Sequence, residues 1–184
     1  MNETLIIIGS VILIYVLYDK TKGTNIKTDN NNNIIDNRKK LEKYIQSIIY
    51  KYNFEVTVPM VLAVINTESG LKNFDNNIVG DTTKQFHSFG IMQVSEPALA
   101  DSSNTYNLNI SSNDIKTDLK SNVLAGTAYL DICYRTAKKE VVPNEVVWFT
   151  FKKYNGGRNI GFNTRSSADV YADKTYKKFL ELNN

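Results

Sequence analysis

One apolar run near the N-terminus constrains this chain more than any other feature. Residues 4–18, TLIIIGSVILIYVLY, carry no charged side chain. At about 1.5 Å per residue, a helix of this length spans roughly 22 Å, against about 30 Å for the hydrocarbon core of a bilayer. Flanking side chains that reach the headgroups, or a locally thinner bilayer, make up the difference. The run therefore predicts an N-terminal transmembrane helix within residues 1–20.

A cleaved signal peptide and a buried core helix are the alternatives for this run. A secretory signal has a basic start and small residues before its cleavage point, whereas this chain begins Met-Asn-Glu and leaves the run through Val-Leu-Tyr-Asp-Lys. An uncleaved, single-pass membrane anchor is therefore favoured. By the positive-inside rule, Lys20 and Lys22 weakly favour a cytoplasmic C-terminal side.

Residues 21–35 show no apolar period and contain an asparagine tract, which predicts an Asn-rich flexible linker. Residues 36–184 then remain for a single globular domain of ordinary length. The net charge of the whole chain is +3, from 22 Lys and Arg against 19 Asp and Glu. Because the lysines are scattered singly and form no stripe, nucleic acid is not expected as the main partner.

The chain has one cysteine and one histidine. A single cysteine cannot close a disulfide within the chain, and the two residues together cannot supply the four ligands of a structural zinc. We therefore expect neither a bound metal nor a cofactor. Cys133 is interpreted as a small buried hydrophobe, and His87 as a loop residue.

Apolar residues recur at helical spacing over most of residues 36–184 and strand signals are few, so a mainly α-helical fold is expected. A loop-rich stretch, residues 71–111, interrupts the helices, and so long a loop inside a compact domain is usually functional. The expected helices begin at Asp36 as N-cap, at Pro59, near Ser112 or Asn113, after Pro143 with Asn144 as cap, and near Ser167.

Glu68 occupies the last turn of the expected helix that begins at Pro59 and stops at Gly70. A helix C-terminus carries partial negative charge, so a carboxylate there is disfavoured and holds its proton more tightly. Such a group is a candidate general acid. A surface glutamate at a fraying helix end is the simpler interpretation, and the segments that accompany Glu68 decide between the two.

Four segments follow Glu68-Ser69-Gly70 in order: Ser88-Phe89-Gly90-Ile91-Met92-Gln93, Asn122-Val123-Leu124-Ala125-Gly126-Thr127-Ala128-Tyr129-Leu130, Tyr154-Asn155-Gly156-Gly157, and Tyr171. Together they resemble the lytic transglycosylase family (SLT domain), which has a goose-lysozyme-like fold, over roughly residues 58–179. The S-F-G-I-M-Q motif is most similar to that of compact members found in phage particles and secretion systems. The resemblance implies a lysozyme-like helical domain with a loop-rich cleft segment.

The resemblance also implies roles for the matched residues around the acid. Glu68 matches the single catalytic acid of the family, and Ser69 matches the neighbour that helps hold it in place. Tyr154 and Asn155 match one wall of the glycan cleft, where an aromatic ring keeps the carboxyl partly desolvated. Tyr171 matches the aromatic residue whose hydroxyl lies close to the acid.

The opposite wall of the cleft corresponds to the segment that starts at Ser88. The resemblance implies that Ser88, Met92 and Gln93 contribute to the substrate-binding cleft. Gly90 would allow the backbone to approach the sugar closely, because glycine has no Cβ.

Other residues of these segments are interpreted as scaffold. Asn122 and Gly126 lie on an apolar stripe, so the amide of Asn122 is expected to be buried and bonded to backbone. Phe54, Trp148 and Phe151 are expected in the core. In the loop-rich stretch, Asp75 or Asp81 could supply a second carboxylate that activates water in an inverting hydrolase, although solvated loop acids are the favoured interpretation.

The resemblance implies cleavage of the β-1,4 bond between N-acetylmuramic acid and N-acetylglucosamine in peptidoglycan, with 1,6-anhydromuramyl products. A muramidase that hydrolyses the same bond, and a catalytically silent glycan-binding module, are the alternatives. The anchor suggests local cell-wall opening during phage entry or assembly of a secretion machine. The domain would then face peptidoglycan from a virion membrane or the bacterial envelope, in contact with other proteins of the particle or complex.

Overall fold

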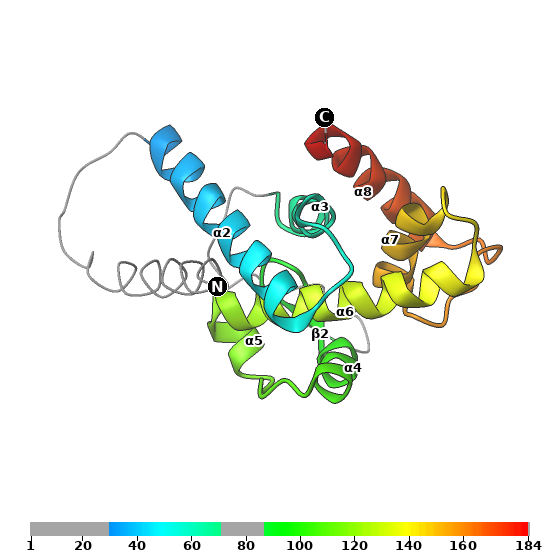
Figure 1. Cartoon of the computed structure of the whole chain (residues 1–184), viewed down its shortest axis with the longest axis horizontal. Helices are drawn as coiled ribbons and strands as arrows, with labels where there is room; N and C mark the ends of the chain where they lie inside the picture. Colours follow the sequence, from blue (N-terminus) through cyan, green and yellow to red (C-terminus); the bar gives the residue numbers. More distant parts are fainter. Residues whose placement is uncertain (1–29, 71–86, 184) are drawn as a thin grey trace, which may run out of the picture. The chain divides into compact units, whose positions relative to one another are not determined.

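The computed structural model describes residues 30–70 and 87–183, and residues Ile34–Asn184 form one compact unit. Helices make up most of the described chain (Figure 1), so the mainly α-helical prediction is confirmed. In chain order the elements are α2 (Asn30–Tyr52), α3 (Val58–Glu68), β1 (Ser88–Phe89), β2 (Val94–Ser95), α4 (Glu96–Tyr106), α5 (Asp114–Thr117), α6 (Leu119–Glu140), α7 (Val146–Gly156) and α8 (Ser167–Asn183).

The predicted membrane anchor, residues 1–20, lies outside the described residues. Within residues 30–70 and 87–183, the search for a helix able to cross a bilayer found none. The last part of the predicted linker, residues 21–35, is described and is helical, because α2 begins at Asn30. The N-cap expected at Asp36 is therefore wrong. An asparagine costs a helix no more than about 0.7 kcal/mol relative to alanine, so the tract can extend a helix whose later turns are packed.

The later turns of α2 are the packed ones. Leu41, Ile45 and Ile48 bury their side chains in the main hydrophobic core, at the spacing of one helical face. The hydroxyl of Tyr44 donates a hydrogen bond of 3.0 Å to the carbonyl of Lys120 on α6. The N-terminal part of the domain is thus attached to its central helix by both apolar and polar contacts.

Helix α3 agrees with the prediction at both ends. Thr57 is its N-cap and Pro59 lies in its first turn, where a missing N–H costs nothing. Every side chain from Met60 to Ile65 is buried, so α3 is a core helix that is apolar on all sides. It ends at Glu68, and Gly70 has a left-handed backbone with φ of 78°.

The loop-rich stretch contains a helix that the sequence did not predict. Helix α4 has Ser95 as its N-cap, whose side chain accepts from the amide of Ala98, and Asn107 in the left-handed conformation as its C-cap. Just before α4, strands β1 and β2 pair antiparallel, with Ser88 opposite Ser95. We refer to residues 88–95 as the hairpin.

The helix expected to start near Ser112 or Asn113 is divided into α5 and α6. Asp118 separates the two because its backbone is extended, with φ of −118° and ψ of 117°. Its carboxylate accepts from the amides of Lys120 and Ser121, which caps the start of α6.

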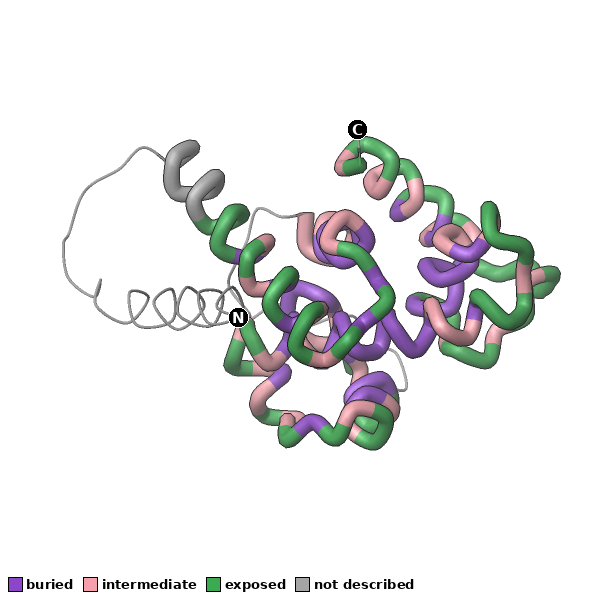
Figure 2. The backbone as a smooth tube through the Cα atoms, in the orientation of Figure 1, coloured by how far each residue is buried: buried purple, intermediate pink, exposed green. Residues whose placement is uncertain are grey.

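Helix α6 is the centre of the unit, and it contacts α4, α5, α7 and β2. Figure 2 shows its middle as continuously buried, and the buried residues include Val123, Ala125, Leu130 and Cys133. Helices α7 and α8 pack on each other, and α8 also packs on α3. The N-cap of α7 is Glu145, one residue after the expected Asn144, and α8 begins at Ser167 as predicted.

A buried carboxylate on α6 holds the turn between α2 and α3. The Asp131 side chain is fully buried, and one of its oxygens accepts from the backbone amides of Glu55 and Val56. The other oxygen accepts from the Tyr106 hydroxyl and from Arg135. Four donors therefore satisfy one buried charge, which links α4 and α6 to the turn that precedes α3.

Replacing Asp131 should weaken the fold more than any surface charge does. An amide at this position keeps only one acceptor oxygen, so Asp131→Asn is expected to lower the free energy of unfolding by about 2 to 3 kcal/mol. Glu42→Gln is the matched control, because Glu42 forms an exposed ion pair of 2.9 Å with Arg38 and should cost less than about 0.5 kcal/mol. Urea denaturation of both variants measures the difference, and equal midpoints would contradict this role for Asp131.

Candidate functional site

Glu68 is the last residue of α3 and is half-buried. The turn that holds it is closed by the residues that follow. The amide of Ser69 donates to the carbonyl of Ile65 at 2.9 Å, and so does the Ser69 hydroxyl. The amide of Gly70 donates to the carbonyl of Asn66 at 3.2 Å. Ser69 thus holds the acid indirectly, by closing the helix end.

Two tyrosines from other helices lie close to the Glu68 carboxylate. Burial raises the pKa of Tyr171 on α8, and the negative charge of Glu68 raises it further. The same two causes, in the same order, hold the pKa of Tyr154 on α7 well above its ordinary value. Both tyrosines therefore stay neutral and can act as hydrogen-bond donors beside the acid. The structure brings together Glu68, Tyr154 and Tyr171 as the sequence implied.

The two tyrosines differ in their hydrogen bonding. The Tyr154 hydroxyl donates to the carbonyl of Met92 at 2.8 Å, which ties α7 to the hairpin. The Tyr171 hydroxyl is buried, and no contact that it makes in the described part of the chain meets full hydrogen-bonding geometry. The Glu68 carboxylate nevertheless lies close enough to act on this hydroxyl as an acceptor, which adds to its raised pKa. The hydroxyl is therefore a donor beside the acid.

The hairpin presents polar groups through a tight turn. Gly90 and Gln93 both have left-handed backbones, with φ of 69° and 48°. The Gln93 side chain donates to the carbonyl of Gly90 at 2.8 Å, and the Ser88 hydroxyl lies 3.1 Å from the Gln93 side-chain oxygen. Gln93 thus holds the turn together while it lines the neighbouring cavity. The positive φ of Gly90 explains a glycine at that position.

Met92 differs from its predicted place in the cleft. Its side chain is completely buried in the main core, against α6. A Cβ on Gly126 would lie 2.6 Å from the Met92 sulfur, so that glycine makes room for the methionine. An apolar thioether gains more by filling this gap than by facing solvent, and only the Met92 carbonyl takes part in the site.

Asn122 is the scaffold residue that the sequence predicted, and it is fully buried. Its side-chain oxygen accepts from the amide of Met92 at 3.1 Å. Its side-chain nitrogen donates to the carbonyls of Phe89 at 2.7 Å and Ile115 at 3.0 Å. One amide therefore satisfies backbone groups on both sides of the hairpin turn and at the end of α5.

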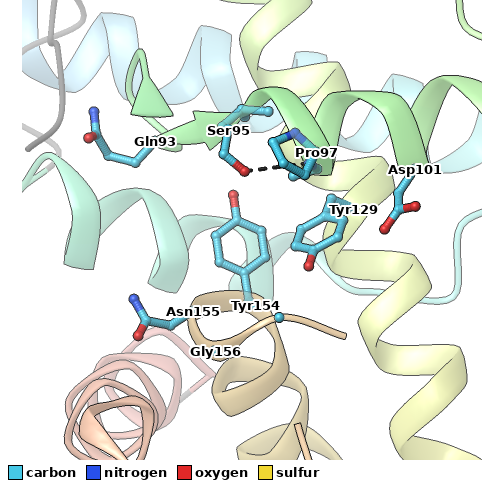
Figure 3. A pocket seen from close by; sticks show the side chains of 11 residues that line it. Gln93, Ser95, Pro97, Asp101, Tyr129, Tyr154, Asn155 and Gly156 are labelled. Atoms are coloured by element: carbon cyan, nitrogen blue, oxygen red, sulfur yellow. Dashed lines mark hydrogen bonds between the residues drawn. The ribbon is translucent and has the colours of Figure 1, made fainter. Parts of the chain in front are cut away.

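A cavity of about 400 Å³ lies between the hairpin, α4 and the end of α7. Figure 3 shows the Tyr154 ring rising from α7 with its hydroxyl toward the hairpin, and Tyr129, Asn155 and Asp101 around it. The lining mixes amide, hydroxyl, carboxylate and aromatic groups. Tyr154 borders this cavity, and the charge of Glu68 raises its pKa. It therefore connects the cavity to the acid. Asn155 lines the cavity with an exposed side chain.

Two buried lysines support this end of α7, and their burial was not predicted from the sequence. Lys153 and Lys152, immediately before Tyr154, are 0% and 1% exposed. The Lys153 ammonium group donates to the carbonyls of Arg158 and Ile160 and pairs with Glu140 at 2.9 Å. The Lys152 ammonium group donates to the carbonyls of Phe162 and Thr164 and pairs with Asp169 at 2.8 Å. The loop between α7 and α8 therefore folds around two cations.

The structure describes two of the four remaining candidates, His87 and Cys133. Asp75 and Asp81 lie outside the described residues, so the question of a second carboxylate stays open. His87 is exposed and its ring contacts Phe89, while Cys133 is buried as expected. In the described ranges, His, Cys, Asp and Glu form no group of three that could hold a metal ion.

This arrangement suits proton transfer to a glycan. A carboxyl group at a helix end, two neutral tyrosines and an adjoining polar cavity can hold a sugar and protonate its glycosidic oxygen. A family model described as the Transglycosylase SLT domain matches residues 43–177. The chain belongs to this family, whose members are lytic transglycosylases: glycan-cleaving lyases with a lysozyme-like fold that act on peptidoglycan. A comparison with curated proteins found no match.

Removing the Tyr171 hydroxyl should lower the activity without changing the stability of the fold. Because no contact of this hydroxyl meets full hydrogen-bonding geometry, Tyr171→Phe is expected to leave the free energy of unfolding within about 0.5 kcal/mol of wild type. Cleavage of peptidoglycan should fall about tenfold, because a donor beside the acid is lost. Tyr176→Phe, on the same helix, is the control and should change neither. A Tyr171→Phe variant with full activity would show that the hydroxyl has no part in the reaction.

Proposed function

We propose that this chain is a membrane-anchored lytic transglycosylase in which Glu68 acts first as general acid and then as general base. The substrate would be the β-1,4 bond between N-acetylmuramic acid and N-acetylglucosamine. The observation that carries the proposal is the position of Glu68 at the end of α3, beside the neutral side chains of Tyr154 and Tyr171.

The proposed reaction has two steps. In the first, protonated Glu68 gives its proton to the glycosidic oxygen, the bond from the anomeric carbon to that oxygen breaks, and the acetamido oxygen of the muramyl sugar closes onto the anomeric carbon. In the second, the Glu68 carboxylate takes the proton of the muramyl 6-hydroxyl, whose oxygen displaces the acetamido group. The acid is thereby regenerated, no water is consumed, and a 1,6-anhydro ring is formed.

The residues around Glu68 support both steps. Tyr171 supplies a neutral hydroxyl beside the acid, and the hairpin is held in place by Asn122 and Tyr154. A preorganised site of this kind lowers the reorganisation needed in the transition state. A muramidase would use the same acid and pass the intermediate to water, and a silent module would use the cavity for binding alone.

Glu68→Gln tests whether the site is catalytic. Glutamine has nearly the same shape but cannot donate the proton, and general acid catalysis contributes about 10² to 10⁴-fold. The variant should bind insoluble peptidoglycan as wild type does and should release no soluble fragments. Glu145→Gln, at the N-cap of α7, is the control for loss of a carboxylate elsewhere. A Glu68→Gln variant that kept more than about a tenth of the wild-type rate would refute the assignment.

The products distinguish transglycosylation from hydrolysis. Released muropeptides should carry anhydromuramyl ends, about 18 mass units below the hydrolytic products, because the intermediate closes on its own hydroxyl. Mass spectrometry of digested sacculi measures this directly. Asp75→Asn and Asp81→Asn should both remain active. Loss of activity in either variant, together with reducing muramic acid ends, would indicate a muramidase.

The apolar run at residues 4–18 supports the membrane part of the proposal. We propose that the domain is anchored in a virion membrane or in the bacterial cell envelope and faces peptidoglycan, where other proteins of the particle or secretion complex would be its neighbours. Tethering suits local opening of the wall, because it limits cleavage to the region that the linker can reach.

Flotation with liposomes tests the anchor. The full chain should float with vesicles, whereas a chain that begins at Asn30, the first residue of α2, should remain in the soluble fraction and retain cleavage activity. The control is a full chain with two leucines of the apolar run, Leu5 and Leu13, changed to lysine. Equal partition of all three proteins would remove the anchor from the proposal.

A further inference from the structure

One face of α8 meets the last turn of α3 residue by residue. Tyr171, Thr175 and Lys178 are spaced four and three apart, which places them on the same side of the helix. Tyr171 lies beside Glu68, and the Thr175 hydroxyl lies 3.1 Å from the Thr67 hydroxyl. The next contact in this series is made by Lys178 and Asn66.

Lys178 closes this series with two hydrogen bonds. Its ammonium nitrogen donates to the Asn66 carbonyl at 2.5 Å and lies 3.3 Å from the Asn66 side-chain oxygen. The Asn66 carbonyl is one of the last of α3, where no later amide of the helix can donate to it. It accepts instead from the Gly70 amide, just beyond the helix, and from Lys178. A cation at this end also opposes the partial negative charge of the helix terminus.

The pKa of Lys178 depends on charged groups around it, and Glu68 is one of them. Burial lowers the pKa of Lys178, Lys174 lowers it further, and the carboxylates of Glu181 and Glu68 raise it. Of these three charged groups, Lys174 and Glu181 lie on α8 with Lys178, and Glu68 lies on α3. The lysine is therefore the cation that α8 brings to the catalytic end of α3.

We propose that Lys178 is a positioning residue for Glu68, which holds the last turn of α3 against α8 through Asn66 and places a positive charge beside the carboxylate. This inference rests on the proposed function, because it assigns Lys178 to the same reaction. The charge would favour the carboxylate form of Glu68, which is produced in the first step when Glu68 gives its proton to the glycosidic oxygen.

The test compares three variants of the full chain in detergent: Lys178→Met, Lys178→Arg and Lys174→Met. Lys174 is exposed on the same helix, so its variant loses the same charge at a solvent-facing position. Lys178→Met should reduce kcat/KM for sacculus cleavage at least about tenfold, because the acid is less well placed. It should also move the alkaline limb of the pH–activity profile to higher pH, because losing a nearby cation favours protonated Glu68.

Lys178→Arg keeps the charge and should restore both the position of the limb and most of the rate. Lys174→Met should resemble wild type. The inference is overturned if Lys178→Met matches Lys174→Met, or if both Lys178 variants lose activity in parallel with lowered melting temperature and an unmoved limb.

A measurement independent of cleavage separates this inference from the proposed function. In protein labelled with ¹³C at glutamate carboxyls, the titration midpoint of Glu68 should rise in Lys178→Met and stay in place in Lys178→Arg. If wild type cleaves no peptidoglycan, the proposed function fails, and this titration alone decides whether Lys178 acts on Glu68. If wild type cleaves but the midpoint is the same in all variants, only the role of Lys178 fails.

Discussion

The need to pair buried backbone polar groups shapes this domain more than any other constraint. Its loops pass close to the core, where unpaired carbonyls and amides cost about 1 to 3 kcal/mol each. Three kinds of buried side chain meet that need: the Asn122 amide under the hairpin, the Asp131 carboxylate under the turn before α3, and the ammonium groups of Lys152 and Lys153 inside the loop after α7. The apolar core supplies the burial, and these polar side chains determine which loop conformation is buried. The candidate site lies where α7 and α8 meet the end of α3. Tyr154 joins it to the hairpin, so its geometry depends in part on the same pairs.

Much of the helical framework could be predicted because its ends carry strong local signals. Pro59 and Gly70 frame α3, and Pro143 and Gly156 frame α7, each for reasons of backbone geometry that act within a few residues. Helix α4 was missed because its apolar positions are few, although Ser95 and Pro97 mark its start. The division at Asp118 was missed because an aspartate can lie within a helix or cap the next one, and only the extended backbone there distinguishes the two.

The sequence predicted the site residues that match a family motif, but it did not predict those whose place depends on whether the side chain is buried. Glu68, Tyr154 and Tyr171 come together as the family resemblance implied, and the amide of Asn122 is buried as its apolar stripe indicated. The burial of Met92 was not predicted because Met92 lies in the turn between β1 and β2, and the sequence does not show which side of that turn faces α6. The burial of Lys152 and Lys153 could not be predicted, because lysine is almost always exposed. Their burial depends on carbonyls of the loop that follows them.

The contacts that surround Glu68 join residues far apart in sequence: 108 residues separate Thr67 from Thr175, and 112 separate Asn66 from Lys178. This separation orders events during biosynthesis. A ribosome releases the chain from its N-terminus at about 5 to 20 residues per second, so α3 emerges well before the helix that completes its surroundings. Until α8 leaves the ribosome and docks, the acid has neither Tyr171 beside it nor Lys178 behind it. The reactive group is therefore incomplete until α8 has been made, which delays any wall-degrading activity until α8 has docked on α3.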